Sequence, residues 1–124
     1  MHIVNRLGYV INSTQETTTV DKKPIIGKKI HSILTYPSEA DVVKNIINDV
    51  LKTHRARYCT YTIDGLDFIS LIFPAPGLRN IVEVHECGYG SWSQRKIALR
   101  LLEQKCKERF HGPSCSLKNG TNKK

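Results

Sequence analysis

The sequence lacks any apolar run long enough to cross a bilayer: nothing in its 124 residues approaches the ~18 apolar positions that a spanning helix needs. Its first residues also lack the apolar stretch of a secretory signal peptide. It contains no C-x₂-C or H-x₃₋₅-H pair, no glycine-rich phosphate loop and no nucleophile elbow. These absences argue against a membrane-spanning or exported protein and against the commoner zinc and nucleotide-hydrolysing sites.

Cysteine is sparse and irregularly spaced. Without an export signal, the four cysteines are expected to stay reduced, in a cytoplasmic protein with the nucleus as an alternative location. Zinc-type residues do occur near the C-terminus, but they include no C-x₂-C or H-x₃₋₅-H pair that would pre-organise two ligands. We therefore expect no metal and no cofactor. The residues weighed for zinc are Cys87, Cys106, His111 and Cys115.

Positive charge is abundant and lies at the two ends of the chain. The net charge is +8, with residues 88–110 carrying six basic against two acidic side chains and residues 111–124 carrying no acid. Residues 37–87 are mildly acidic. Such a distribution favours polyanionic partners, nucleic acid in particular, over neutral small molecules.

Apolar periodicity and turn residues predict an alternation of helices and strands. Two helical patterns flank three β-branched or apolar runs, and Asp64-Gly65 is typical of a tight hairpin turn. Before them, residues 1–11 predict one strand, residues 12–15 a polar turn and residues 17–20 a second strand. The expected helices span about 38–54 and 93–110, and the expected strands span 58–63, 68–73 and 80–86.

This order predicts an α+β fold, α-β-β-β-α, with a three-stranded antiparallel sheet covered on one face by both helices. Residues 1–36 form a basic N-terminal strand or hairpin extension, residues 37–112 the domain, and residues 113–124 a basic flexible tail. Both helices then share one core, and Leu101→Ala is expected to cost about 2–5 kcal/mol. The expected core residues are Ile46, Val50, Leu71, Phe73, Val84, Leu101 and Leu102.

The start of the second helix carries the strongest functional signal. Gly88-Tyr89-Gly90 leads into Ser91 and Gln94, a candidate capping box, and Arg95 and Lys96 follow with no acid beside them. Cations are unfavourable at this end of a helix dipole unless an anion docks there. Helix N–H groups and basic side chains together predict a phosphate site.

Over residues 38–110 the chain resembles the double-stranded RNA-binding domain family. It has the α-β-β-β-α order of that family, the glycine turn 88–90, and a diluted version of its basic motif in 93–98. The resemblance implies that these cations bridge phosphates and that the first helix touches the minor groove of an RNA duplex. The chain departs from the family in the loop 64–67, which has two carboxylates where the family has a proline and a histidine.

The resulting hypothesis is a non-catalytic nucleic-acid-binding protein that takes duplex RNA, such as a small viral or regulatory protein that sequesters it. The alternative is a protein-interaction or homodimerisation module of the same topology; neither needs a membrane or a small-molecule substrate. An enzymatic interpretation of His85-Glu86-Cys87 is disfavoured because alternation on a strand puts Glu86 on the other face. Trp92 is expected to be structural, whereas Tyr89 remains open. The residues expected to contact nucleic acid are Arg95, Lys96, Arg100, Lys28, Lys29 and Tyr89.

Overall fold

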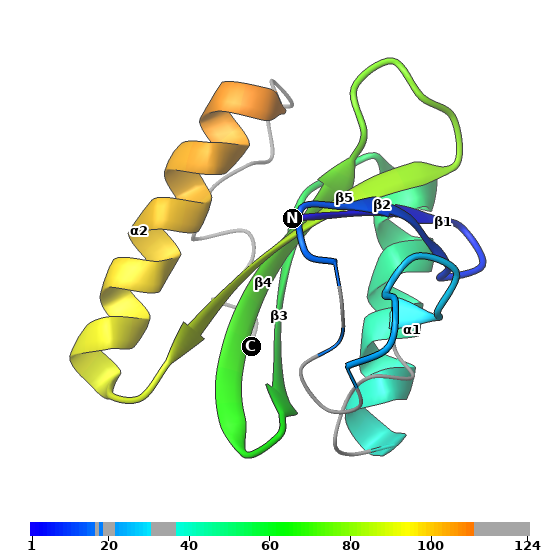
Figure 1. Ribbon diagram of the computed structural model, residues 1–124. Helices are drawn as coiled ribbons and strands as arrows, with labels where there is room; N and C mark the ends of the chain where they lie inside the picture. The colour runs from blue at the N-terminus through cyan, green and yellow to red at the C-terminus, as the bar shows by residue number, and fades with distance from the viewer. Residues whose placement is uncertain (17, 19–21, 31–36, 111–124) are drawn as a thin grey trace.

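The computed structural model describes residues 1–16, 18, 22–30 and 37–110, and contains one antiparallel sheet and two helices (Figure 1). The predicted strand 17–20 and the predicted tail 113–124 thus lie largely or wholly outside the described residues. Neither described helix is long and apolar enough to span a membrane. In chain order the elements are β1 (His2–Asn5), β2 (Val10–Ser13), α1 (Pro37–Thr53), β3 (Arg57–Ile63), β4 (Leu66–Pro74), β5 (Ile81–Tyr89) and α2 (Trp92–Arg109).

The sheet has five strands in the order β2-β1-β5-β4-β3, so the expected three-stranded sheet is wrong. The N-terminal hairpin is part of the sheet, because β1 pairs antiparallel with β5 over its whole length. Its turn lies at residues 6–9, earlier than predicted: the Asn5 side chain accepts hydrogen bonds from the N–H groups of Leu7 and Tyr9, and Gly8 has a φ of 93°. An Asx-type turn followed by a glycine is a strong turn signal. It was missed because the loose apolar alternation of residues 1–11 suggested one strand.

The two helices lie on opposite faces of the sheet, which corrects the expectation that both cover one face (Figure 1). Val43, Ile47 and Val50 of α1 pack on one face, whereas Ala98, Leu102 and Cys106 of α2 pack on the other. The central strand β4 explains this arrangement, because every residue from 69 to 74 is buried. A strand that is apolar at successive positions needs cover on both faces.

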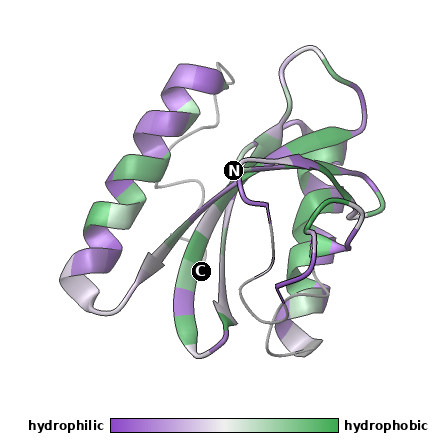
Figure 2. Ribbon diagram, viewed as in Figure 1, coloured by the Kyte–Doolittle hydropathy of each residue, from purple (hydrophilic) through white to green (hydrophobic). Residues whose placement is uncertain are grey.

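Only part of the expected core is buried. Val50, Leu71, Phe73, Val84 and Leu102 are at most 4% exposed, and Ile46 is half-buried. Leu101, in contrast, is 59% exposed, so its placement in the core is wrong. Figure 2 shows α2 alternating between hydrophobic and hydrophilic residues along its length, and its buried stripe is narrow, one residue per turn.

The hairpin between β3 and β4 confirms the turn predicted at Asp64-Gly65. Both residues have positive φ values, 51° and 78°, as a type I′ turn requires. The outer edge of β3 is covered near this end by α1, because the Glu39 carboxylate accepts the Thr62 N–H at 2.8 Å. An edge strand whose N–H groups are capped by a neighbouring helix is less open to further strand pairing.

Candidate functional site

The start of α2 is built as the sequence indicated. Ser91 is the N-cap and has extended backbone angles, and its hydroxyl accepts the Gln94 N–H at 3.3 Å. The Gln94 side chain reaches back and accepts the N–H of Gly90 at 2.7 Å, one residue before the N-cap. The capping box is therefore confirmed, with its return bond displaced by one residue. This pair of bonds fixes the direction in which the first turn of α2 leaves the end of β5.

Arg95 lies against two aromatic rings. Its guanidinium carbon is 5.1 Å from the centre of the Trp92 ring and 6.0 Å from that of Tyr89. Trp92 is 69% exposed, so the expectation of a structural, packed tryptophan is wrong. A planar cation held over aromatic faces is pre-organised to meet a phosphate or a base. The sequence signal for this arrangement was the spacing of Trp92 and Arg95, which puts them on neighbouring turns of one helix.

The cations of α2 fall into two groups that differ in their partners. Lys105 pairs with Glu108 at 3.7 Å, Lys107 with Glu103 at 3.8 Å, and Arg109 with Glu83 at 2.5 Å. Arg95, Lys96 and Arg100 have no carboxylate within ion-pair distance among the described residues, and the first turn of α2 contains no acid. Positive charge is therefore uncompensated only in the first half of the helix, where the helix dipole adds to it. We call Tyr89, Trp92, Arg95, Lys96 and Arg100 the α2 patch.

A groove runs beside the α2 patch, between the ends of β4 and β5 and the first turns of α2. Its volume is about 480 Å³. Most of its lining is apolar, and the lining includes Cys87, a half-buried cysteine that forms no disulfide. The lining residues are Leu66, Cys87, Gly88, Tyr89, Gly90, Gln94, Ile97 and Ala98. Sequence reasoning did not find this groove, because its walls are more than twenty residues apart in the chain.

Lys28 and Lys29 are not part of the α2 patch. They lie in the segment that runs beside β2, where residue 29 forms a bridge with Tyr9 and its ammonium is 5.4 Å from the Tyr9 ring centre. The flanking Ile25 and Ile30 belong to the core on the α1 face, opposite α2. The contribution of these two lysines to nucleic-acid binding stays a prediction.

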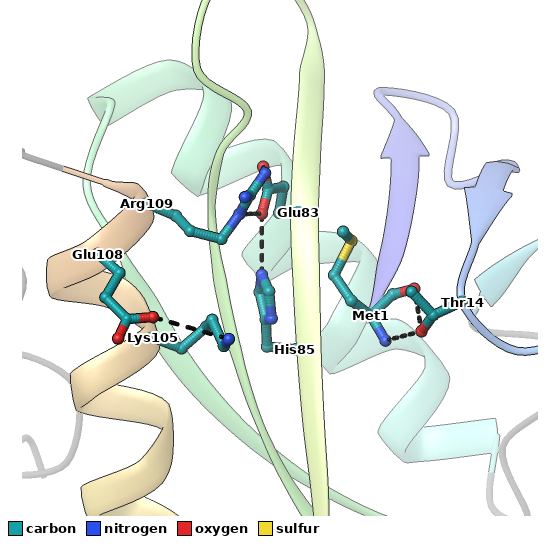
Figure 3. A network of polar contacts seen from close by, with 7 residues as sticks. All are labelled: Met1, Thr14, Glu83, His85, Lys105, Glu108 and Arg109. Carbon is teal, nitrogen blue, oxygen red and sulfur yellow. Dashed lines mark hydrogen bonds and ion pairs between the residues drawn. The ribbon is translucent and has the colours of Figure 1, made fainter.

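A buried polar cluster anchors the other end of α2 (Figure 3). Glu83 is 2% exposed and accepts two hydrogen bonds from Arg109, at 2.5 and 2.7 Å, and one from His85 at 2.9 Å. Burial alone would raise the pKa of Glu83, but the bonds from Arg109 and His85 outweigh it and lower the pKa. Burial lowers the pKa of His85, which also stacks on Phe73. His85 is itself buried, at 7% exposed.

A second polar chain lies on the opposite face of β5 and includes a serine, a histidine and a glutamate. His2 Nδ1 is 2.8 Å from the Ser13 hydroxyl, and His2 Nε2 is 2.7 Å from Glu86. The Tyr61 hydroxyl also bonds Glu86. Burial would raise the pKa of Glu86, but its bonds to His2 and Tyr61 lower it, and burial raises the pKa of Tyr61 well above its usual value.

The contacts from Ser13 through His2 to Glu86 have the connectivity of a hydrolytic triad but not its surroundings. The Ser13 hydroxyl accepts the Gln15 N–H at 2.9 Å, and the neighbouring Thr14 N–H is bonded to the Met1 carbonyl. Both main-chain donors that follow the serine are thus engaged, whereas acyl transfer needs donors aimed at a developing oxyanion. The arrangement favours a structural role: it ties β1, β5 and β3 together through the half-buried carboxylate of Glu86.

The cysteines do not form a metal centre in the part of the chain that the structure describes, where no group of three suitable ligands comes together. His111 and Cys115 lie outside the described residues. Cys106 is disulfide-bonded, which corrects the expectation of a reduced thiol there, whereas Cys59 and Cys87 are free. Burial raises the pKa of Cys59 to about 12. Glu86 and Cys87 do lie on opposite faces, as strand alternation predicted.

Comparison with known proteins adds no family to these observations: no family model, curated protein or solved structure matches the chain. The resemblance to double-stranded RNA-binding domains implied that both helices approach one duplex. With α1 and α2 on opposite faces, α1 does not stand beside the α2 patch. The candidate site therefore consists of the α2 patch and the adjoining groove.

Proposed function

We propose that this protein binds nucleic acid through phosphate contacts made by Arg95, Lys96 and Arg100. The observation that carries the proposal is the division of cations along α2, in which the first half of the helix holds three without acidic partners and the second half holds three paired ones. Uncompensated charge repels itself and is unfavourable at a helix N-terminus, so an anionic ligand relieves it. Contacts of this kind position the ligand without reading base sequence.

Two adjacent aromatic rings, the exposed Trp92 and the half-buried Tyr89, support nucleic acid over a simple anion. Tyr89 and Trp92 stand next to the cations, with Arg95 over both rings. Binding grooves for nucleic acid combine cations along the backbone with aromatic faces for bases, and each stacked base is worth about 1–3 kcal/mol. Inorganic phosphate or an acidic peptide would use the cations but not the rings.

The test compares two double variants of equal charge. Arg95→Ala with Lys96→Ala removes two unpaired cations of the α2 patch, and Lys105→Ala with Lys107→Ala removes two paired ones from the same helix. Lys105 is about 15 Å along the helix from Arg95, beyond the ~10 Å screening length at ~0.1 M salt. Both variants are expected to fold, because the four side chains are largely or partly exposed.

The readout is fluorescence anisotropy of a labelled RNA over a salt series. The salt slope is the slope of the logarithm of affinity against the logarithm of salt concentration. Losing two phosphate contacts lowers its magnitude by about 1.4 for a single strand, which is about 25-fold in affinity at ~0.1 M salt. For a duplex the slope falls by about 1.8, which is about 60-fold in affinity. The control pair is expected to change affinity by less than about threefold. Equal losses for the two pairs would show that net charge alone drives binding, and an unchanged slope in the first pair would end the proposal.

A second candidate function, self-association, is favoured by one observation. Ile97 and Leu101 are 55% and 59% exposed on the flank of α2. Exposed apolar side chains that neighbour each other on a helix are typical of docking faces. Light scattering across a concentration series tests this: a dimer that Leu101→Glu dissociates, and that does not weaken with added salt, would favour this function over nucleic-acid binding.

A further inference from the structure

The groove beside the α2 patch has the size and lining of a small-ligand site. Its volume of about 480 Å³ falls within the range of ligand-binding sites, and the groove is largely open to solvent. Leu66 and Ile97 supply apolar walls, and Tyr89 belongs both to this groove and to the α2 patch. A ligand whose charged part lies on the patch can therefore place an uncharged, apolar-faced part in the groove.

Charge differs between the two sides of the groove. On the helix side lie the unpaired cations Arg95 and Lys96. On the strand side, outside the lining, Asp67 follows the lining residue Leu66 and pairs with Tyr89 in the β4–β5 ladder; its carboxylate accepts the Thr62 hydroxyl at 3.2 Å and keeps further acceptor capacity. A carboxylate repels phosphate but accepts hydrogen bonds from the amino groups of bases. A nucleic acid is therefore oriented with its backbone along α2 and a base edge toward the strands.

We propose that the groove holds an unpaired nucleobase, so that the preferred ligand is single-stranded nucleic acid. This inference rests on the proposed function and specifies its ligand. A base inside a duplex is paired and stacked and cannot enter a groove of this kind, whereas a base in a single strand or loop is free to do so. The position of α1 on the far face of the sheet agrees with this, because among the described residues no second helix lies beside the α2 patch to span a duplex.

Cys87 provides a reporter inside the groove. Its thiol is free and half-buried, whereas Cys59 is buried with its pKa raised to about 12, and Cys106 is already disulfide-bonded. Alkylation with N-ethylmaleimide, read at each thiol by peptide mass spectrometry, should label Cys87 and leave Cys59 unlabelled as an internal check of folding. A base seated in the groove must block this reaction.

The experiment measures the alkylation rate of Cys87 in the full chain with four additions: none, an oligouridylate, a duplex of equal length, and an abasic oligonucleotide with the same phosphates. At about ten times the Kd, the oligouridylate should slow alkylation about tenfold by mass action. The duplex and the abasic strand should leave the rate within about twofold even where anisotropy shows them bound. Equal protection by either of them would overturn the base-in-groove inference.

The converse measurement uses protein already alkylated at Cys87. The adduct occupies the groove, so the affinity for a single strand should fall about fivefold or more, which is the smallest effect expected for losing one stacked base. The salt slope should stay unchanged, because the phosphate contacts remain. Unchanged affinity after alkylation would also overturn the inference. Failure of the proposed function looks different: no RNA would then bind in anisotropy, or binding would be insensitive to the Arg95 and Lys96 substitutions.

Discussion

Two neighbouring leucines can be used to test which face of α2 packs against the sheet. Leu102 is 4% exposed and packs in the core on the α2 face, whereas Leu101 is 59% exposed. Leu102→Ala removes buried methyl and methylene groups and leaves a cavity, which costs about 2–5 kcal/mol. Leu101→Ala makes the same chemical change on the solvent side, where alanine is also a slightly better helix former, so it should cost less than about 1 kcal/mol.

Urea denaturation followed by circular dichroism gives both values. With an m-value of about 1–3 kcal/mol/M, a loss of about 3 kcal/mol moves the midpoint by about 1–3 M, and the Leu101 variant should stay close to the parent protein. The two variants differ by one position in sequence and not at all in composition, so the comparison isolates burial. If Leu101→Ala destabilised the protein as much as Leu102→Ala, α2 would pack with a different face toward the sheet.

Two further predictions concern the buried polar groups. Tyr61→Phe should cost about 1–3 kcal/mol because it leaves an oxygen of the half-buried Glu86 without its donor. Tyr58→Phe should be neutral or stabilising because the Tyr58 hydroxyl has no partner among the described residues. Urea titrations that rank the two variants the other way would contradict this. The pKa values of His85, Glu83 and Glu86 are lowered in the folded protein, so the unfolded chain binds more protons as the pH falls. The free energy of unfolding should therefore decrease on acidification. The first decrease begins below pH ~6.5, where an unfolded histidine titrates, and the second below pH ~4.3, where unfolded carboxyl groups titrate. His85→Gln should flatten the first step, whose slope is at most about 1.4 kcal/mol per pH unit, and an unchanged first step in that variant would refute the role of His85.

The local elements of this protein were predictable because the interactions that form them are local. Ser91 and Gln94 are three residues apart, so their capping bonds could be inferred from spacing alone. Asp64-Gly65 supplied the two positive φ values of a hairpin turn. The N-terminal turn at Gly8 was also a local feature, and it was missed because the loose alternation of residues 1–11 suggested one continuous strand.

The helix that covers each face of the sheet, and the order of the strands, were harder to predict from the sequence. The nearly continuous apolar run 68–73 indicated a strand in the interior, but not which helix would cover which side. Whether β1 would pair with β5 depends on partners about eighty residues apart, and pairing at such separations is determined by the packing of the whole sheet. Once that pairing exists, the sheet has five strands and room for one helix on each face.

The sequence by itself determined where the helices and most of the strands begin, how α2 is capped, and which basic residues open that helix, because spacing and residue type are sufficient for each. Tertiary structure alone decided that Leu102 rather than Leu101 is buried, since two adjacent apolar residues fit a helical pattern equally well until a sheet face selects one. It also decided that Glu83 would neutralise Arg109 while Arg95 and Lys96 stayed unpaired, and that Leu66 and Ile97 would line the same groove. These contacts join residues distant in sequence, and only the packed chain brings them together.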